Sequence, residues 1–137
     1  MRIGHIENGI VLDHITAGNA MNIYNVLKLG ELDCTVALIK NADSPKMGKK
    51  DIIKISTLLD LDLDVLGYLD PGITVNIIRD GKVAERRRLE LPERVVGVIK
   101  CKNPRCITSV EQEIVHEFKL TDRAKKVYRC IYCEQKA

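Results

Sequence analysis

Hydrophobic and polar residues alternate with two different periods along the first 94 residues of the chain. Alternation with period two, which is typical of a strand with one buried face, occurs in four segments: 9–15, 34–40, 51–56 and 73–91. The last segment contains an Asp-Gly pair at 80–81, which predicts two strands joined by a tight turn. Apolar residues at helical spacing occur in two further segments: 19–30 and 60–69.

The order of these elements is βαββαβ with one additional strand. This order predicts an α+β fold of the ferredoxin-like type, in which both helices cover one face of an antiparallel sheet. In that topology the first strand lies between the third and the fourth, so the open face of the sheet collects side chains from all three. Strand parity places seven residues on this open face: Val11, Asp13, Lys50, Ile52, Lys54, Asn76 and Ile78.

The polar residues of this face suit an anionic heterocycle. Amines such as those of Lys50 and Lys54 bind phosphate, and Asp13 and Asn76 can hydrogen-bond a base or a sugar. The aliphatic residues between them would contact the ring of the ligand. From the pattern alone, however, an ordinary solvated face is the more frequent outcome.

The last 43 residues form a distinct basic segment. Residues 95–137 carry nine Lys and Arg against five Asp and Glu, a net charge of +4, whereas residues 1–94 carry 13 against 14, a net charge of −1. A segment of this size is below the length at which a hydrophobic core usually suffices, so it needs a covalent or metal link. We therefore expect two domains, 1–94 and 95–137.

Four of the five cysteines lie in this segment with the spacing C-x4-C-x23-C-x2-C: Cys101, Cys106, Cys130 and Cys133. This spacing is typical of structural zinc, and a shell of four thiolates leaves no position for a reactive water. We therefore expect one structural Zn²⁺ in a small all-β domain that resembles a zinc ribbon. Two disulfides or four unrelated thiols are the alternative. His116 lies between the pairs and could replace a ligand, and Cys34 is expected to be a small core residue.

Composition excludes several classes of protein. The chain is 45% apolar and 30% charged, and it has no apolar run of the roughly 20 residues that span a bilayer. Its N-terminus lacks the uninterrupted apolar stretch of a secretory signal, so we expect a cytoplasmic protein without membrane contact. There, thiols stay reduced and closely paired cysteines are more often metal ligands than disulfide partners.

Two other functions can be considered from the residues. A zinc ribbon that binds nucleic acid is suggested by the basic segment with its aromatic residues, but glutamates interrupt the basic positions and the chain has only five aromatic residues in total. An enzyme is suggested by Asp13-His14 and by Cys34. On a regular strand His14 would face away from Asp13, and no motif supplies a base for Cys34. We therefore expect neither nucleic-acid binding nor catalysis.

The motifs VLDHITAG, MGKKDIIKI, TVNIIRDGKV, LPERV and CKNPRCI…CIYC occur in this order. With them the sequence resembles the regulatory chains of aspartate carbamoyltransferase, an enzyme of pyrimidine biosynthesis, over nearly its whole length. The resemblance implies a non-catalytic subunit with an N-terminal allosteric domain that binds CTP as inhibitor and ATP as activator. It also implies a C-terminal zinc domain that docks on the catalytic chain, and regulatory homodimers that bridge catalytic trimers.

The resemblance also implies roles for individual residues. Asp13, with Val11, would contact the base or ribose of the effector, and Lys50, Ile52 and Lys54 would serve the ribose and phosphates. Asn76 and Ile78 would line the site. Arg86, with Val83 beside it, stands where relatives commonly carry a phosphate-binding lysine, although the run Arg86–Arg88 could instead be surface charge. The effector would act by binding one quaternary state better than the other.

Overall fold

The computed structural model describes residues 6–137, and the chain divides into two compact units, Met1–Leu89 and Glu90–Ala137. The division lies before the expected boundary at 94, because the chain already joins the second sheet at Glu93, whose carbonyl oxygen accepts a hydrogen bond from the backbone nitrogen of Leu120 at 2.8 Å. None of the helices within residues 6–137 is long and apolar enough to cross a membrane.

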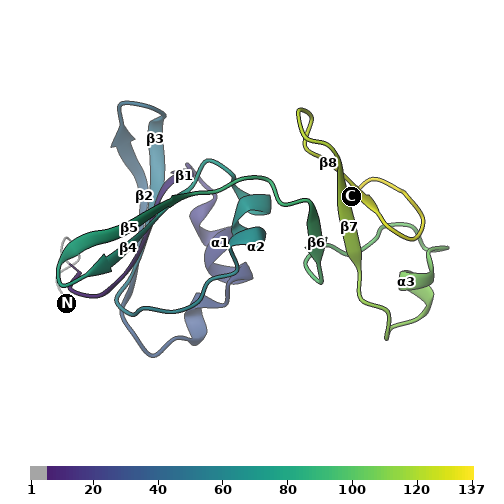
Figure 1. Cartoon of the computed structure of the whole chain (residues 1–137), viewed down its shortest axis with the longest axis horizontal. Helices are drawn as coiled ribbons and strands as arrows, with labels where there is room; N and C mark the ends of the chain where they lie inside the picture. The colour runs from purple at the N-terminus through teal and green to yellow at the C-terminus, as the bar shows by residue number, and fades with distance from the viewer. Residues whose placement is uncertain (1–5) are drawn as a thin grey trace. The chain divides into compact units, whose positions relative to one another are not determined.

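The first unit is an antiparallel sheet with helices on one side, as Figure 1 shows. Its strands have the order β2-β3-β1-β4-β5, which confirms the predicted α+β fold. The elements are β1 (Gly9–Thr16), α1 (Ala20–Val26), the 3-10 turn η1 (Leu29–Glu31), β2 (Val36–Ser44), β3 (Gly48–Ile55), α2 (Leu63–Leu69), β4 (Thr74–Arg79) and β5 (Lys82–Arg88).

Both helices are shorter than the periodicity predicted. The first ends at Val26 because Lys28 adopts the left-handed conformation, with φ of 55°, and separates α1 from η1. The second begins after Asp62, whose carboxylate accepts hydrogen bonds from the backbone nitrogens of Asp64 and Val65 at 3.1 and 3.2 Å. The preceding residues of the predicted helix therefore form a loop.

The core lies between the helices and the inner face of the sheet. Its members are aliphatic residues that are at most 3% exposed, among them Ile10, Leu12, Ile15, Ile23, Ile53, Ile55, Leu66 and Val75. Along β3 the buried positions are odd-numbered, whereas Lys50, Ile52 and Lys54 are half-buried on the other face. Buried and half-buried residues therefore alternate along β3 as the sequence pattern predicts.

One buried carboxylate joins three segments of the first unit. Asp51 of β3 is fully buried and accepts hydrogen bonds from the backbone nitrogens of Gly18, Ala20 and Asn41 at 2.9, 3.2 and 3.0 Å. Burial alone would raise its pKa, but the N–H groups of Asn41, Ala20 and Gly18 hold the pKa of Asp51 below its ordinary value. The start of α1 and the irregular part of β2 are therefore both tied to the centre of the sheet.

The second unit has a three-stranded sheet of order β6-β7-β8 and one short helical turn. Its elements are β6 (Arg94–Val96), α3 (Ile107–Val110), β7 (Glu117–Asp122) and β8 (Val127–Cys130). The buried residues of this unit include Val95, Phe118 and Tyr128, together with two of the four clustered cysteines. So small a core agrees with the expectation that this segment needs an additional link.

Candidate functional sites

The open face of the first sheet brings together the residues that strand parity had selected. Val11 lies opposite Lys54 of β3 on one side and Asn76 of β4 on the other. Asp13 lies opposite Thr74, and Ile78 lies opposite Gly9. The side chains of Val11, Asp13, Lys50, Ile52, Lys54, Asn76 and Ile78 therefore occupy the face that the helices leave open.

A bulge in β5 decides which of its residues reach this face. Asn76 pairs with Arg86 but Ile78 pairs with Val83, so one extra residue, Ala84, interrupts the alternation. Val83 and Arg86 consequently share the open face although they are three positions apart. The Nε atom of Arg86 donates to Oδ1 of Asn76 at 3.0 Å.

Beyond the bulge, regular strand alternation separates the three consecutive arginines. Arg88 pairs with Thr74 and joins Arg86 on the open face. Arg87 lies on the opposite face, where its Nε forms an ion pair with Glu85 at 2.6 Å. The arginine run is therefore not a uniform patch of surface charge.

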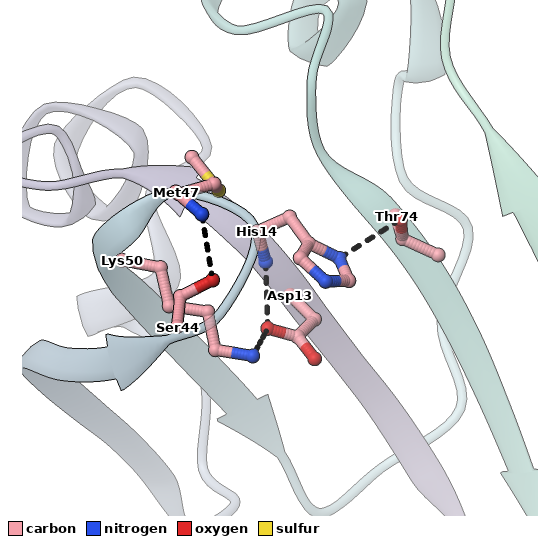
Figure 2. A network of polar contacts seen from close by, with 6 residues as sticks. All are labelled: Asp13, His14, Ser44, Met47, Lys50 and Thr74. Atoms are coloured by element: carbon pink, nitrogen blue, oxygen red, sulfur yellow. Dashed lines mark hydrogen bonds and ion pairs between the residues drawn. The ribbon is translucent and has the colours of Figure 1, made fainter.

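Asp13 is held by two donors at the end of β1. Figure 2 shows that the amine of Lys50 and the backbone nitrogen of His14 both meet Oδ1 of Asp13, at 2.9 and 2.6 Å. The side chains of Lys50 and Asp13 are only 16% and 23% exposed. Burial would raise the pKa of Asp13, but the hydrogen bonds from Lys50 and His14 lower it below its ordinary value.

The expectation that His14 faces away from Asp13 is wrong. His14 lies in a bulge, with φ of 59° and a register shift between Leu12 and Ile15, so the strand gains a residue without changing its buried face. The ring of His14 turns toward Thr74, and its Nδ1 lies 3.2 Å from the Thr74 hydroxyl oxygen (Figure 2). His14 and Asp13 therefore line the same part of the face.

A polar cavity of about 290 Å³ opens at this end of the face. Three of its lining residues were predicted as site residues from the sequence: Asp13, Asn76 and Arg86. Four other lining residues with polar side chains were not: His14, Lys46, Thr74 and Arg88. Strand parity could have found Thr74 and Arg88, since they match Asn76 and Arg86 in their own strands. Several cations around a single carboxylate suit a ligand with more than one negative charge.

A larger cavity of about 430 Å³ lies on the other face of the sheet. It is lined mainly by aliphatic residues, including four leucines between Leu58 and Leu63. Its two arginines, Arg79 and Arg87, are balanced by Asp60 and Glu85, and Arg87 is already paired with Glu85. This cavity does not suit a polyanion, and the smaller polar cavity is the better candidate for a phosphate-bearing ligand.

The second unit contains a cluster of four sulfur atoms. Sγ of Cys101 lies 3.5 Å from that of Cys133, Sγ of Cys106 lies 3.6 Å from that of Cys130, and all four atoms lie within 4.8 Å of one another. A tetrahedral ion with metal–sulfur distances of about 2.3 Å separates its sulfurs by about 3.8 Å. All of these cysteines are free, so the disulfide alternative is wrong and the donor set fits a metal ion.

Two backbone turns position the thiols. Asn103 closes the first, because its carbonyl oxygen accepts a hydrogen bond from the backbone nitrogen of Cys106 at 3.1 Å. In the second, the backbone nitrogen of Glu134 donates to the carbonyl oxygen of Cys130 at 2.8 Å. His116 does not replace a thiol, because its Nδ1 accepts a hydrogen bond from the backbone nitrogen of Cys101 at 2.9 Å.

The thiols differ in acidity before any metal binds. A hydrogen bond to Thr108 lowers the pKa of Cys106 to about 6, whereas burial raises the pKa of Cys101 to about 12. A bound cation would favour the thiolate form of all four. Because all four positions of a tetrahedral shell would be protein sulfur, the arrangement can hold a metal but offers no open site for chemistry. Cys34, which was expected to be a core residue, is half-buried and packs against the core of the first unit.

Comparison with known proteins covers both units. The family described as aspartate carbamoyltransferase regulatory chain, allosteric domain, matches residues 1–90, and the corresponding metal binding domain matches residues 93–137. Proteins named aspartate carbamoyltransferase regulatory chain are similar at 56% identity in Clostridium acetobutylicum, over 98% of this chain and 92% of the relative. The identity is 52% in Clostridium tetani, over 98% and 94%, and 44% in Bifidobacterium longum, over 100% and 99%.

Proposed function

Because the chain belongs to the family of aspartate carbamoyltransferase regulatory chains, a non-catalytic subunit, we propose that it binds CTP and ATP on its open sheet face. Through the same family relationship it has catalytic chains as partners. The observation that carries the nucleotide proposal is the convergence of Lys50, Arg86 and Arg88 around Asp13 and Asn76 on one face. A nucleoside triphosphate offers several negative charges for the cations and polar groups for the other two residues.

Different residues of the open face bind different parts of the nucleotide. Lys50, Lys54 and Arg86 bind the phosphates, and Arg86 can do so with two donors at once. Asp13 accepts hydrogen bonds from the ribose or base, and Asn76 offers its amide. The aliphatic residues of the site contact the ring and sugar: Val11, Ile52, Ile78 and Val83.

Lys50 can pair either with Asp13 or with the phosphates of a bound nucleotide. In the structure the amine of Lys50 neutralises Asp13. A triphosphate competes for this amine, and Asp13 then accepts a donor from the nucleotide instead. The effector changes activity only as far as it binds the two quaternary states with different affinity, so coupling is a property of the assembly.

The metal of the second unit is zinc, one ion per chain at the cluster of four cysteines. Zinc prefers sulfur ligands in tetrahedral geometry, and a complete thiolate shell makes it structural. Free thiols that ligate a metal suit a reducing compartment, so the protein functions in the cytoplasm. Regulatory homodimers that bridge catalytic trimers complete the proposed assembly.

The surface of the second unit supports a docking role. Six of the large apolar residues exposed on the chain lie in this unit: Val96, Ile107, Val110, Val115, Ile131 and Tyr132. Exposed apolar residues of this kind are typical of protein contacts. The metal folds this unit, so it affects assembly directly and nucleotide binding only indirectly.

The test is reconstitution with the catalytic trimer of the same organism. The metal-loaded chain is mixed with the trimer, the mass of the product is measured, and aspartate saturation is recorded with and without CTP and ATP. A larger complex whose saturation curve moves with nucleotide supports the proposal. Failure to form any complex would overturn the regulatory assignment, whereas a complex that ignores both nucleotides would overturn the effector site alone.

A further inference from the structure

The sheet of the second unit carries a row of cations across its strands. Arg94 of β6 pairs with Lys119 of β7, and Lys119 pairs with Arg129 of β8. A bridge between Arg129 and Lys136 extends the row by one segment. Because residues paired in register project from the same face, four basic side chains stand side by side on adjacent segments.

This face is opposite the buried side of the sheet. The neighbours of the row in sequence, Val95, Phe118 and Cys130, are at most 3% exposed. Lys119 is exposed and Arg129 is half-buried. The basic face therefore does not contribute to the core or to the thiol cluster.

Like charges that lie directly opposite each other destabilise a sheet. Arg94 is compensated, since it forms an ion pair with Glu117 at 2.5 Å. Neither Lys119 nor Arg129 forms an ion pair with another residue within 6–137. The whole unit, with ten Lys and Arg against seven Asp and Glu, is itself positive by three charges. The row is thus a local excess of charge that the unit does not neutralise.

The row borders a cavity of about 580 Å³. Arg94, Lys119 and Arg129 line it together with Ile131, which is 38% exposed. The carbonyl oxygen of Glu134 accepts a hydrogen bond from Arg129 at 3.0 Å and holds the guanidinium in place. A fixed arginine beside an exposed apolar residue is typical of a protein contact rather than of a site for a free anion.

The spacing of the row indicates the form of the partner. Neighbouring strands lie about 4.8 Å apart, and residues three or four apart on a helix have Cβ atoms about 5–6 Å apart. Carboxylates at such positions on one helix face would meet successive cations of the row. We propose that the face formed by Arg94, Lys119 and Arg129 docks a carboxylate-bearing helix of the catalytic chain. This inference rests on the proposed function, which supplies the partner.

The experiment measures affinity of the metal-loaded chain for the catalytic trimer in Lys119→Glu, Lys119→Arg and Lys125→Glu variants. Lys125 is an exposed lysine in the turn of the same unit, so Lys125→Glu makes an equal charge change away from the row. Lys119→Glu is expected to weaken binding about tenfold, and Lys119→Arg and Lys125→Glu to stay within about twofold of the unmodified chain. Unchanged metal content and circular dichroism establish that each variant is folded.

A salt titration supplies a second readout. Raising the salt concentration should weaken binding of the unmodified chain more than that of Lys119→Glu, because the attraction lost in the variant is the one that salt screens. Equal affinity of Lys119→Glu and Lys125→Glu, or equal salt dependence of Lys119→Glu and the unmodified chain, overturns the inference while leaving the proposed function intact. If the unmodified chain itself does not bind the trimer, the proposed function fails, and this inference fails with it.

Discussion

Replacing Asp51 by asparagine should destabilise the first unit more than any other single charge removal on its sheet. The two carboxylate oxygens accept three backbone hydrogen bonds from Gly18, Ala20 and Asn41. An asparagine of the same size keeps one oxygen and places an amide nitrogen where the other acceptor was. At least one N–H group then loses its acceptor in a site that is closed to water, since Asp51 is 0% exposed.

The magnitude follows from the kind of bond that is lost. A hydrogen bond to a charged group contributes about 1.5–3 kcal/mol, and a buried donor without a partner costs about 1–3 kcal/mol. We therefore expect Asp51→Asn to lower the free energy of unfolding by about 3 kcal/mol, a large part of the 5–15 kcal/mol typical of a domain. Urea unfolding, followed by circular dichroism with the metal site loaded, measures this change.

A matched control is Asp43→Asn. The Asp43 side chain is 92% exposed and pairs with Lys49 at the surface, so its loss should change stability by less than about 0.5 kcal/mol. The pH dependence gives a second check. Because the folded pKa of Asp51 is lowered, its contribution is present above the unfolded value of about 3.9 and is lost as the pH falls through the folded pKa. If Asp51→Asn unfolds at the same urea concentration as Asp43→Asn, the assigned role of the carboxylate is refuted.

Two further results are expected. Arg86→Ala should weaken CTP binding by about tenfold, because it removes a charged donor from the proposed site. Arg87→Ala, on the opposite face, should leave the affinity for CTP within about twofold. Calorimetric titration compares the two variants, and equal losses of affinity would contradict the placement of the nucleotide. Removing the metal with a chelator should release catalytic trimers from the assembly, because the ion folds the docking unit; a chelated sample that stays fully assembled after its metal has been shown to be gone would contradict the structural role.

Strand parity and cysteine spacing predicted much of this architecture because both depend on local, regular geometry. Along β3 the alternation is unbroken, so Lys50 and Lys54 lie where counting placed them. The predictions that are wrong concern positions where the backbone departs from regular strand or helix geometry. A bulge at His14 turns its ring toward Thr74, and Lys28 ends α1 early by adopting a left-handed conformation. His14 contacts Thr74, which is 60 residues away in the sequence, and a periodicity count contains no information about such a contact. Nor does the count predict a single left-handed residue such as Lys28.

The sequence pattern also could not predict every residue that lines the candidate site. Lys46 lies in the turn between β2 and β3, and its position over the cavity depends on how that turn folds back. Arg88 and Thr74, in contrast, could have been predicted by continuing the parity count to the ends of β4 and β5. The candidate metal ligands needed no such count, because four cysteines in two close pairs already specify a donor set.

The strand that carries Arg86 is also the outer edge of its sheet, and all seven residues of β5 are exposed. An exposed edge has unpaired backbone groups that can template aggregation, and charged side chains are a common protection against it. Five of the seven residues of KVAERRR are charged. The arginines of this strand therefore also favour solubility, so substitutions that remove several of them at once would confound lost affinity with precipitation. Variants of this strand should change one charge at a time and be checked for monodispersity before any titration.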